Sequence, residues 1–446
     1  MTKLRLLLTA TLGALVALTL ASLTGQMNQS VASSKYADID RLANVMALIE
    51  QHYVEEVDTH ELLEGAIEGM LGTLDPHTSY MSPDLFKEMQ LDTRGEFEGL
   101  GIEITKQRDG YVTIVAPIDG TPAAAAELRA RDQIVAVCPD IDDEESCELT
   151  QELSLLEAVK LMRGKRGSTV MLKVLRQGWA EPNDFVIQRG RIEVSSVRMQ
   201  MIEPGLPYIR LSQFQERTAE DLQDALEEAT DQGPLQGLVL DLRNNPGGLL
   251  DQAVKVADVF LEEGLIVYSE GRGGGSRMEW SASASNTQPE YPIFVLVNEG
   301  SASASEIVAG ALQDHRRGVV LGEETFGKGS VQTIIPLENE SGLRLTTALY
   351  YLPTGRSIQE VRIQPDVKIG IYTEEEVEAL ESEEETERFG EEDLSGHIKN
   401  KGDSQTADAK KEEFERRLKI DKQLKEAIHL LKTHRILSDL SMKQAG

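Results

Sequence analysis

Small residues connect a predicted strand, residues 292–298, to a predicted helix, residues 306–317, and three of them are the serines Ser301, Ser303 and Ser305. A serine on a tight strand-to-helix turn exposes its hydroxyl. The backbone N–H groups and the dipole at the helix N-terminus can then stabilise a developing oxyanion. This position suits the nucleophile of an acyl-transfer reaction. The alternative interpretation is a flexible loop of serine and alanine with one helix cap.

A nucleophilic serine needs a base, and the sequence offers a lysine rather than a histidine. His315, the nearest histidine, follows Ser303 by twelve residues on the same predicted helix, about 18 Å along its axis, so it cannot reach the hydroxyl. The other histidines lie in the terminal regions. Lys328 stands between Gly327 and Gly329, and a lysine can act as a general base if desolvation lowers its pKa toward neutrality.

The segment around this lysine, residues 322–330, nearly matches the phosphate-binding pattern GxxxxGK[ST]. Gly329 stands where the pattern requires Ser or Thr. Residues 331–335 are predicted to form a strand, whereas a phosphate loop must open a helix. We therefore exclude nucleotide binding at this segment.

Three motifs follow one another along the chain. They are Asp241-Leu-Arg-Asn-Asn-Pro-Gly-Gly248, Gly300-Ser-Ala-Ser-Ala-Ser-Glu-Ile307 and Thr325-Phe-Gly-Lys-Gly-Ser-Val-Gln332. In this order they resemble the motifs of the C-terminal processing (tail-specific) serine proteases, and the resemblance runs from about Tyr36 to Ile371. It implies a PDZ domain inserted before the catalytic core and a Ser-Lys dyad that cuts proteins near their carboxyl termini without a metal or cofactor.

The resemblance also implies roles for individual residues of this sequence. Ser303 is implied as the nucleophile, Lys328 as the general base, and Gln332 as the residue that orients the lysine. Ser301 and Ser305 remain the competing assignments for the nucleophile.

Backbone N–H groups complete two implied binding sites. The Ala304 N–H, together with that of Gly247 or Gly248, resembles the oxyanion hole of the family. Farther toward the amino terminus, Gly95–Ile102 resembles the carboxylate-binding loop of a PDZ domain, whose N–H groups capture a chain-terminal carboxylate while the peptide adds as a strand. The residues of that loop are Gly99, Leu100, Gly101 and Ile102.

The order of predicted elements indicates how these motifs are positioned. Apolar residues have helical spacing over residues 36–94, and short β-rich runs separated by Gly and Pro fill residues 95–190. Strands then alternate with helices over residues 191–371, which favours an α/β core with catalytic loops at strand ends. We predict an α/β (α+β) protease core of the tail-specific protease/crotonase-like type, an inserted β-rich PDZ domain, and helical N- and C-terminal regions.

The last segment, residues 372–446, combines an acidic linker at 374–393 with a predicted helix at 421–440. Leu424, Ile428 and Leu431 give this helix an apolar face that needs a partner. We expect the terminal helices to mediate self-association into a homo-oligomer, or docking to a periplasmic adaptor lipoprotein of the kind that some relatives use.

The amino terminus predicts export. Lys3 and Arg5 precede an apolar run from residue 6 to about residue 23, so residues 1–28 form either a signal peptide or an N-terminal anchor. We therefore expect a periplasmic protein, held at the inner membrane if the segment is not cleaved.

Two cysteines fit this compartment. Cys138 and Cys147 are nine residues apart, and in an oxidising compartment such a pair predicts a disulfide that closes a loop. The sequence has no CxxC pattern, so we expect no cysteine-based metal site.

Length and charge limit the function classes. The chain has 446 residues, about three domains by the usual size, and its formal net charge of −31 argues against nucleic-acid binding. The sequence therefore predicts a protease for protein substrates with apolar C-terminal tails. A PDZ scaffold with an inactive peptidase core, and an acyl-CoA enzyme of the crotonase type, are the alternatives.

Overall fold

The computed structural model describes most of the chain in several stretches. They are residues 37–106, 110–118, 120–141, 143, 146–231, 233–274, 277–285, 287–372 and 420–445. The predicted signal or anchor segment, 1–28, and the acidic linker, 374–393, lie outside these described residues. The chain divides into two compact units, each described by itself. The smaller unit holds the described residues up to Met81 with Ile334–Leu337 and Gly342–Leu345, and the larger unit holds the remainder.

The smaller unit contains two helices, residues 37–52 and α2 (Thr59–Leu71), followed by strand β1 (Ser79–Met81). Helix α2 begins after Asp58, whose carboxylate accepts a hydrogen bond from the His60 N–H and so satisfies a donor of the first turn. Both helices follow the apolar spacing of the sequence. Strand β1, which pairs antiparallel with residues 342–344, is too short to show an alternating pattern and was not predicted.

In the larger unit, helix α3 (Pro83–Arg94) leads into a β-rich domain. It starts with Ser82 as N-cap and a proline in the first turn, and it ends at Gly95, which has a left-handed φ of 79°. Strand β2 (Glu96–Gly99) follows at once and pairs antiparallel with β9 (Gly190–Glu193). The chain therefore enters and leaves the β-rich domain through one two-stranded ribbon.

The β-rich domain is a sheet accompanied by two helices. Its elements are β3 (Ile102–Lys106), β4 (Val112–Pro117), α4 (Pro122–Ala125), β5 (Gln133–Cys138), β6 (Glu148–Leu149), α5 (Leu155–Met162), β7 (Thr169–Leu175) and β8 (Asn183–Gln188). In β7, Val170, Leu172 and Val174 are fully buried and alternate with more exposed neighbours. The strand order β3-β4-β5-β7-β8 leaves β3 at an edge, where an extended peptide can add as a further strand.

A disulfide closes the loop between β5 and β6. It joins Cys138, which is fully buried at the end of β5, to Cys147. This is the pairing that the sequence predicts.

The α/β core is built on a six-stranded sheet. Its strands, in spatial order, are β10 (Val197–Glu203), β11 (Leu206–Leu211), β12 (Leu238–Asp241), β15 (Ile293–Val297), β16 (Val319–Gly322) and β19 (Val367–Lys368). The strands from β11 to β19 are parallel to one another. All residues of β12 and β15 are buried, as expected where helices cover both faces of a parallel sheet.

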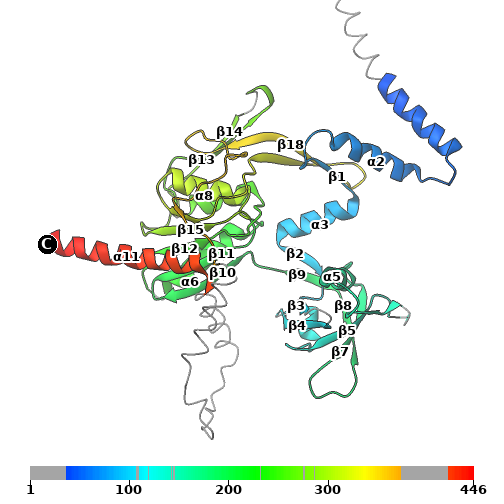
Figure 1. Cartoon of the computed structure of the whole chain (residues 1–446), viewed down its shortest axis with the longest axis horizontal. Helices are drawn as coiled ribbons and strands as arrows, with labels where there is room; N and C mark the ends of the chain where they lie inside the picture. The colour runs from blue at the N-terminus through cyan, green and yellow to red at the C-terminus, as the bar shows by residue number, and fades with distance from the viewer. Residues whose placement is uncertain are drawn as a thin grey trace, which may run out of the picture. The chain divides into compact units, whose positions relative to one another are not determined.

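Helices cover the two faces of this sheet. One face packs against α6 (Thr218–Asp231), α7 (Leu250–Asp258) and α8 (Ala304–Asp314). The other face packs against α11 (Lys422–Ala445), which Figure 1 shows in red beside the sheet. A second sheet completes the core. Its strands are β13 (Leu265–Gly271), β14 (Arg277–Ser281), β17 (Ser330–Pro336) and β18 (Gly342–Tyr351), and β1 pairs with the start of β18.

The partner of the C-terminal apolar face is the protein's own sheet. Leu424, Ile428 and Leu431 are at most 7% exposed and pack against side chains of the core sheet such as Val239 and Leu296. The expectation that this face mediates self-association is therefore wrong, because it is already covered.

None of the helices in the described ranges is long and apolar enough to cross a membrane.

Candidate active site

The serine loop connects β15 to α8, as predicted, but the helix begins at Ala304, two residues earlier than expected. Ser303 is consequently the N-cap residue, with φ 55° and ψ −111°. A positive φ is a strained conformation for a residue with a side chain, and such strain is concentrated at functional sites. Ser303 is partly exposed.

The other two serines of the loop have structural hydrogen bonds. Ser301 Oγ donates to the Leu242 carbonyl at 2.8 Å, and Ser305 Oγ donates to the Asn245 carbonyl at 2.9 Å. Both serines are fully buried. They tie the serine loop to the segment after β12, and neither hydroxyl can approach a substrate. Of the three serines, the geometry leaves Ser303 as the candidate nucleophile.

A buried carboxylate, Glu306, joins the segments of the candidate dyad. Its Oε2 accepts hydrogen bonds from the Ser303 N–H at 2.8 Å and from the Lys328 N–H at 2.9 Å. Its Oε1 accepts from Thr325 Oγ1 at 2.5 Å and from the Gly327 N–H at 2.8 Å. The backbone nitrogens of Ser303 and Lys328 are therefore held on one oxygen atom, although the two residues are 25 positions apart in the chain.

Glu306 was not among the predicted site residues, although Ser303-x-x-Glu306 has the spacing of a helix capping box. Burial of the side chain raises its pKa, and the hydrogen bonds from Thr325, Ser303, Lys328 and Gly327 oppose this shift only in part. The ionised form is the one that accepts from all four donors without presenting a proton to any of them.

Lys328 lies on the loop between β16 and β17 and is partly buried. Residues 330–336 form a strand, as predicted, and not the helix that follows a phosphate loop. Within β17, the Gln332 Nε2 donates to the carbonyl of Ser330 at 3.2 Å and to its hydroxyl at 2.8 Å. These bonds orient the amide, so that Gln332 Oε1 is the end that can accept a hydrogen bond from an ammonium group.

The loop Gly247–Gly248 contacts the serine loop. A Cβ added at Gly247 would lie 2.9 Å from Ser303 Cβ and 3.0 Å from the Ala304 nitrogen, so only glycine allows this approach. The Gly247 N–H donates to Asn245 Oδ1 at 2.9 Å. Among the described residues, neither the Gly248 N–H nor the Ala304 N–H has a protein acceptor. Of the two glycines left open by the sequence, Gly248 is the one with an available donor.

In the β-rich domain, the loop before β3 also presents unpaired N–H groups. The Leu100 carbonyl accepts from the Ala123 N–H, and the Gly101 carbonyl accepts from the Ile118 N–H. The N–H groups of Leu100 and Gly101 have no protein acceptor within the part of the chain that the structure describes. Gly101 has φ 79°, and a Cβ there would lie 2.4 Å from Thr121 Cβ. This loop can therefore bind a carboxylate through its backbone.

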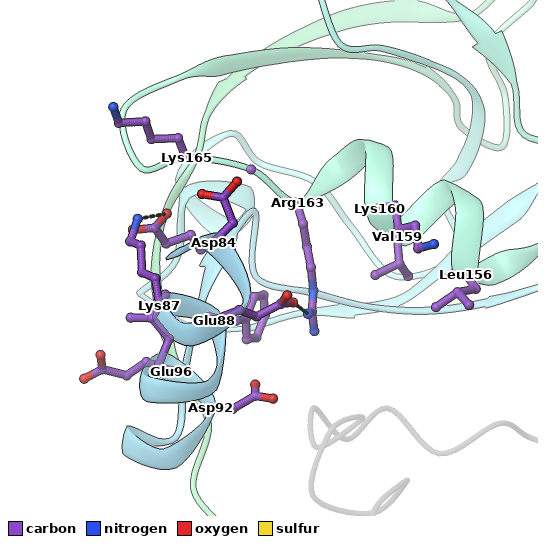
Figure 2. Close-up of a pocket in the computed structure, with 14 residues that line it drawn as sticks. Asp84, Lys87, Glu88, Asp92, Glu96, Leu156, Val159, Lys160, Arg163 and Lys165 are labelled. Atoms are coloured by element: carbon purple, nitrogen blue, oxygen red, sulfur yellow. Dashed lines mark hydrogen bonds and ion pairs between the residues drawn. The ribbon is translucent and has the colours of Figure 1, made fainter. Parts of the chain in front are cut away.

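A cavity of about 710 Å³ lies between α3, β2 and α5. Charged side chains line it, and Figure 2 shows Arg163 beside Glu88, with which it forms an ion pair. The Arg163–Glu88 distance is 3.5 Å, and a second ion pair joins Lys87 to Glu98 at 3.2 Å. The Arg163 guanidinium also lies 5.0 Å from the centre of the Phe97 ring. Gly99 of the carboxylate loop adjoins the cavity, since an added Cβ there would meet the Phe97 ring at 3.1 Å. The apolar lining residues of the cavity are Leu91, Phe97, Leu156 and Val159.

A metal centre has no support in the described ranges, since no three His, Cys, Asp or Glu side chains gather there in a way that could hold an ion.

Comparison with known proteins assigns the family. The model of peptidase family S41 matches residues 205–369, the PDZ domain model matches residues 88–175, and the model described as the activating protease CtpB N-terminal domain matches residues 15–84. A carboxy-terminal-processing protease of Bartonella bacilliformis is 44% identical over 413 residues, which cover 91% of this chain and 92% of that protein. A carboxyl-terminal-processing protease of Synechocystis is 39% identical over 326 residues, covering 72% and 74%. Among solved structures, the photosystem II D1 C-terminal processing protease has 31% identity and a TM-score of 0.43, covering 74% of this chain and 92% of that one.

The α/β core, the inserted PDZ domain and the family match define a serine-type peptidase. More narrowly, the chain belongs to the family of PDZ-containing carboxy-terminal-processing proteases.

Proposed function

We propose that this protease is exported, recognises protein substrates by their C-terminal tails through its PDZ domain, and cleaves near the tail with a Ser303–Lys328 dyad. The observation that carries the dyad is the single oxygen of Glu306 that binds the backbone of both residues. A buried acceptor shared in this way fixes the separation of nucleophile and base before substrate arrives, which is what acyl transfer needs.

The proposed reaction has two steps. Lys328 Nζ takes the Ser303 proton as Oγ attacks the scissile carbonyl, and the N–H groups of Gly248 and Ala304 donate to the resulting oxyanion. The tetrahedral intermediate collapses to an acyl-enzyme as Lys328 returns the proton to the departing amine of the tail fragment. Lys328 then takes a proton from a water molecule as its oxygen attacks the ester, and returns that proton to Ser303 Oγ as the ester bond breaks and the shortened protein leaves. Gln332 Oε1 orients the lysine during these transfers.

Tail recognition is proposed at the loop Gly99–Ile102 and the cavity beside it. The N–H groups of Leu100 and Gly101 would bind the terminal carboxylate, while the tail extends the sheet at the β3 edge. Apolar side chains of the tail would pack against Leu156 and Val159 of α5, which line the cavity. This arrangement selects a substrate by its free end and tolerates varied sequence upstream.

Location and assembly are proposed from different observations. The disulfide supports an oxidising compartment, in agreement with an exported protein whose residues 1–28 act as signal or anchor. In the smaller unit, Ile39, Leu42, Val45 and Leu48 of the first described helix are 41–61% exposed. We propose that this apolar face binds a second copy of the chain or an adaptor lipoprotein.

Replacement of Ser303 or Lys328 by Ala tests the dyad. Each variant should lose turnover of a fluorogenic peptide with an apolar tail by more than a thousandfold, and each should bind the free tail peptide with unchanged affinity. Glu299→Gln is the matched control, since Glu299 is exposed on the same loop and the substitution should leave turnover unchanged. Wild-type turnover by Lys328→Ala would exclude lysine as the base. A wild-type protein that binds tails without turnover would favour the scaffold alternative.

A further inference from the structure

A buried arginine stands between the core sheet and the proposed oxyanion loop. Arg243 follows β12 by two residues, precedes Gly248 by five, and is 8% exposed. Its guanidinium binds two carboxylates at once. Nε and Nη2 donate to Asp241 at 3.0 and 2.7 Å, and Nη1 and Nη2 donate to Asp421, both at 2.7 Å. Two bidentate pairs of this kind fix both the position and the orientation of a guanidinium.

One of these carboxylates comes from the far end of the chain. Asp421 is 178 residues from Arg243 and lies at the start of α11, where it also accepts the Leu424 N–H at 3.0 Å. The neighbouring Gln423 accepts from Arg243 Nη1 at 3.1 Å and donates to the Ile369 carbonyl at 2.8 Å. The first turn of α11 is therefore bonded to the segment after β12 and to the strand end near residue 369.

The segment after Arg243 is continuous with the catalytic loops. Asn245 is fully buried, its Oδ1 accepts the Gly247 N–H, and its Nδ2 donates to the Leu211 carbonyl at 2.9 Å. The Asn245 carbonyl accepts from the Ala302 N–H at 3.0 Å and from Ser305 Oγ at 2.9 Å. A shift of Arg243 would thus reach both the oxyanion glycines and the serine loop through a few short bonds.

We propose that α11 is a positioning element of the active site, and that Asp421 is its positioning residue. The Asp421 carboxylate holds Arg243, and Arg243 holds the 243–248 segment so that the Gly248 N–H points to the oxyanion. This inference rests on the proposed role of Gly248. Without Asp421, the buried guanidinium of Arg243 keeps its hydrogen bonds to Asp241, but two of its N–H groups lose their acceptors. A buried guanidinium with unpaired N–H groups turns toward water or toward another acceptor.

A role in positioning differs from a role in stability alone. If α11 only covered apolar surface, weakening it at any point would lower the unfolding midpoint and leave kcat of the folded enzyme unchanged. If Asp421 positions the oxyanion loop, its loss lowers kcat in protein that is fully folded. Tail binding takes place in the PDZ domain and is not changed in either case.

The experiment compares full-length Asp421→Asn with wild type, measuring kcat, KM and the affinity for a free tail peptide at a temperature where both are folded by circular dichroism. We expect kcat to fall ten- to a hundredfold, somewhat less than loss of a whole oxyanion donor, with KM and tail affinity unchanged. Reaction with a fluorophosphonate, which also needs the oxyanion hole, should slow by a similar factor. Asp421→Glu, which keeps the carboxylate, should recover part of kcat.

Lys432→Ala is the matched control on the same helix. It removes the ion pair between Lys432 and Glu203 at the other end of the docked surface, and neither residue contacts Arg243. It should lower the unfolding midpoint and leave kcat unchanged. Wild-type kcat in Asp421→Asn, or an equal loss of kcat in Lys432→Ala, would overturn the positioning role. Neither result would contradict the proposed dyad. The dyad is tested separately by Ser303→Ala, which should not cleave the same peptide.

Discussion

Replacing Glu306 by Gln separates the catalytic role of this carboxylate from its role in folding. The substitution keeps the shape of the side chain but turns one acceptor oxygen into an NH2 group. Two donors face each oxygen in the wild type, so the amide cannot satisfy all four. It is best placed with its NH2 near Thr325 Oγ1, the only one of the four groups that can also accept. The Ser303 and Lys328 N–H groups then keep a neutral oxygen in place of a charged one.

The magnitude follows from these two bonds. A hydrogen bond to a charged group contributes about 1–1.5 kcal/mol more than a neutral one, so the two bonds together account for about 2–3 kcal/mol. If that energy holds Ser303 and Lys328 in their reactive geometry, kcat/KM should fall about 30- to 160-fold. Glu299→Gln is the matched control, because Glu299 is exposed on the same loop and should give wild-type activity.

The stability of Glu306→Gln should change in the direction opposite to its activity. Burial raises the pKa of Glu306 above its ordinary value, so the protonated side chain is the form that favours folding. Its contribution is fully present below the ordinary pKa and is lost as the pH rises through the raised pKa. Gln imitates the protonated form at every pH. The urea midpoint of the variant, relative to wild type, should therefore rise between pH 4 and pH 8.

The assay is turnover of a fluorogenic tail peptide together with urea unfolding followed by fluorescence at several pH values. A variant with wild-type kcat/KM would refute the idea that Glu306 positions the dyad. A variant that loses activity and stability in parallel at neutral pH would show that the substitution acts through unfolding instead.

Further substitutions test other parts of the site. Gly248→Ala places a Cβ 2.2 Å from the Phe214 carbonyl, and kcat should fall about a hundredfold with unchanged tail affinity; wild-type kcat would remove Gly248 from the oxyanion hole. Gly101→Ala should weaken binding of a tail peptide at least tenfold by titration, whereas Gly120→Ala, also at positive φ but with open space around it, should not. Although burial opposes ionisation of Asp241, bonds from Arg243 and Tyr208 hold its pKa below the ordinary value, so its stabilisation is lost as the pH falls through that lowered pKa. Asp241→Asn should accordingly flatten the decline in urea midpoint between pH 4 and pH 2, and an unchanged slope would contradict this.

The motifs that are contained in a short stretch of the chain could be predicted from the sequence. The serine loop, the glycine-flanked lysine, the Gly99–Ile102 loop and the cysteine pair are each contained in about ten residues, and their spacing predicts a local backbone. The alternation of strands and helices predicted the α/β core for the same reason, since the periodicity of burial is a local property. Strand β1 could not be predicted in this way, because three residues show no period.

The choices between neighbouring candidates needed the tertiary structure. Ser301 and Ser305 have the same type and setting as Ser303 in the sequence, and only their bonds to the carbonyls of Leu242 and Asn245, about 60 residues away, remove them. Gly247 and Gly248 are likewise distinguished by one hydrogen bond to Asn245.

The same holds for interactions between distant segments. The C-terminal helix has an apolar face in the sequence, and the sequence correctly predicts that the face needs a partner. That the partner is the protein's own sheet, and that Asp421 binds Arg243 across 178 residues, depends on how the sheet is wound. Local spacing determined which chemistry this protein carries. Packing between distant segments decided which atoms are free to perform it, because a buried group is available only where the fold leaves its donor or acceptor unpaired.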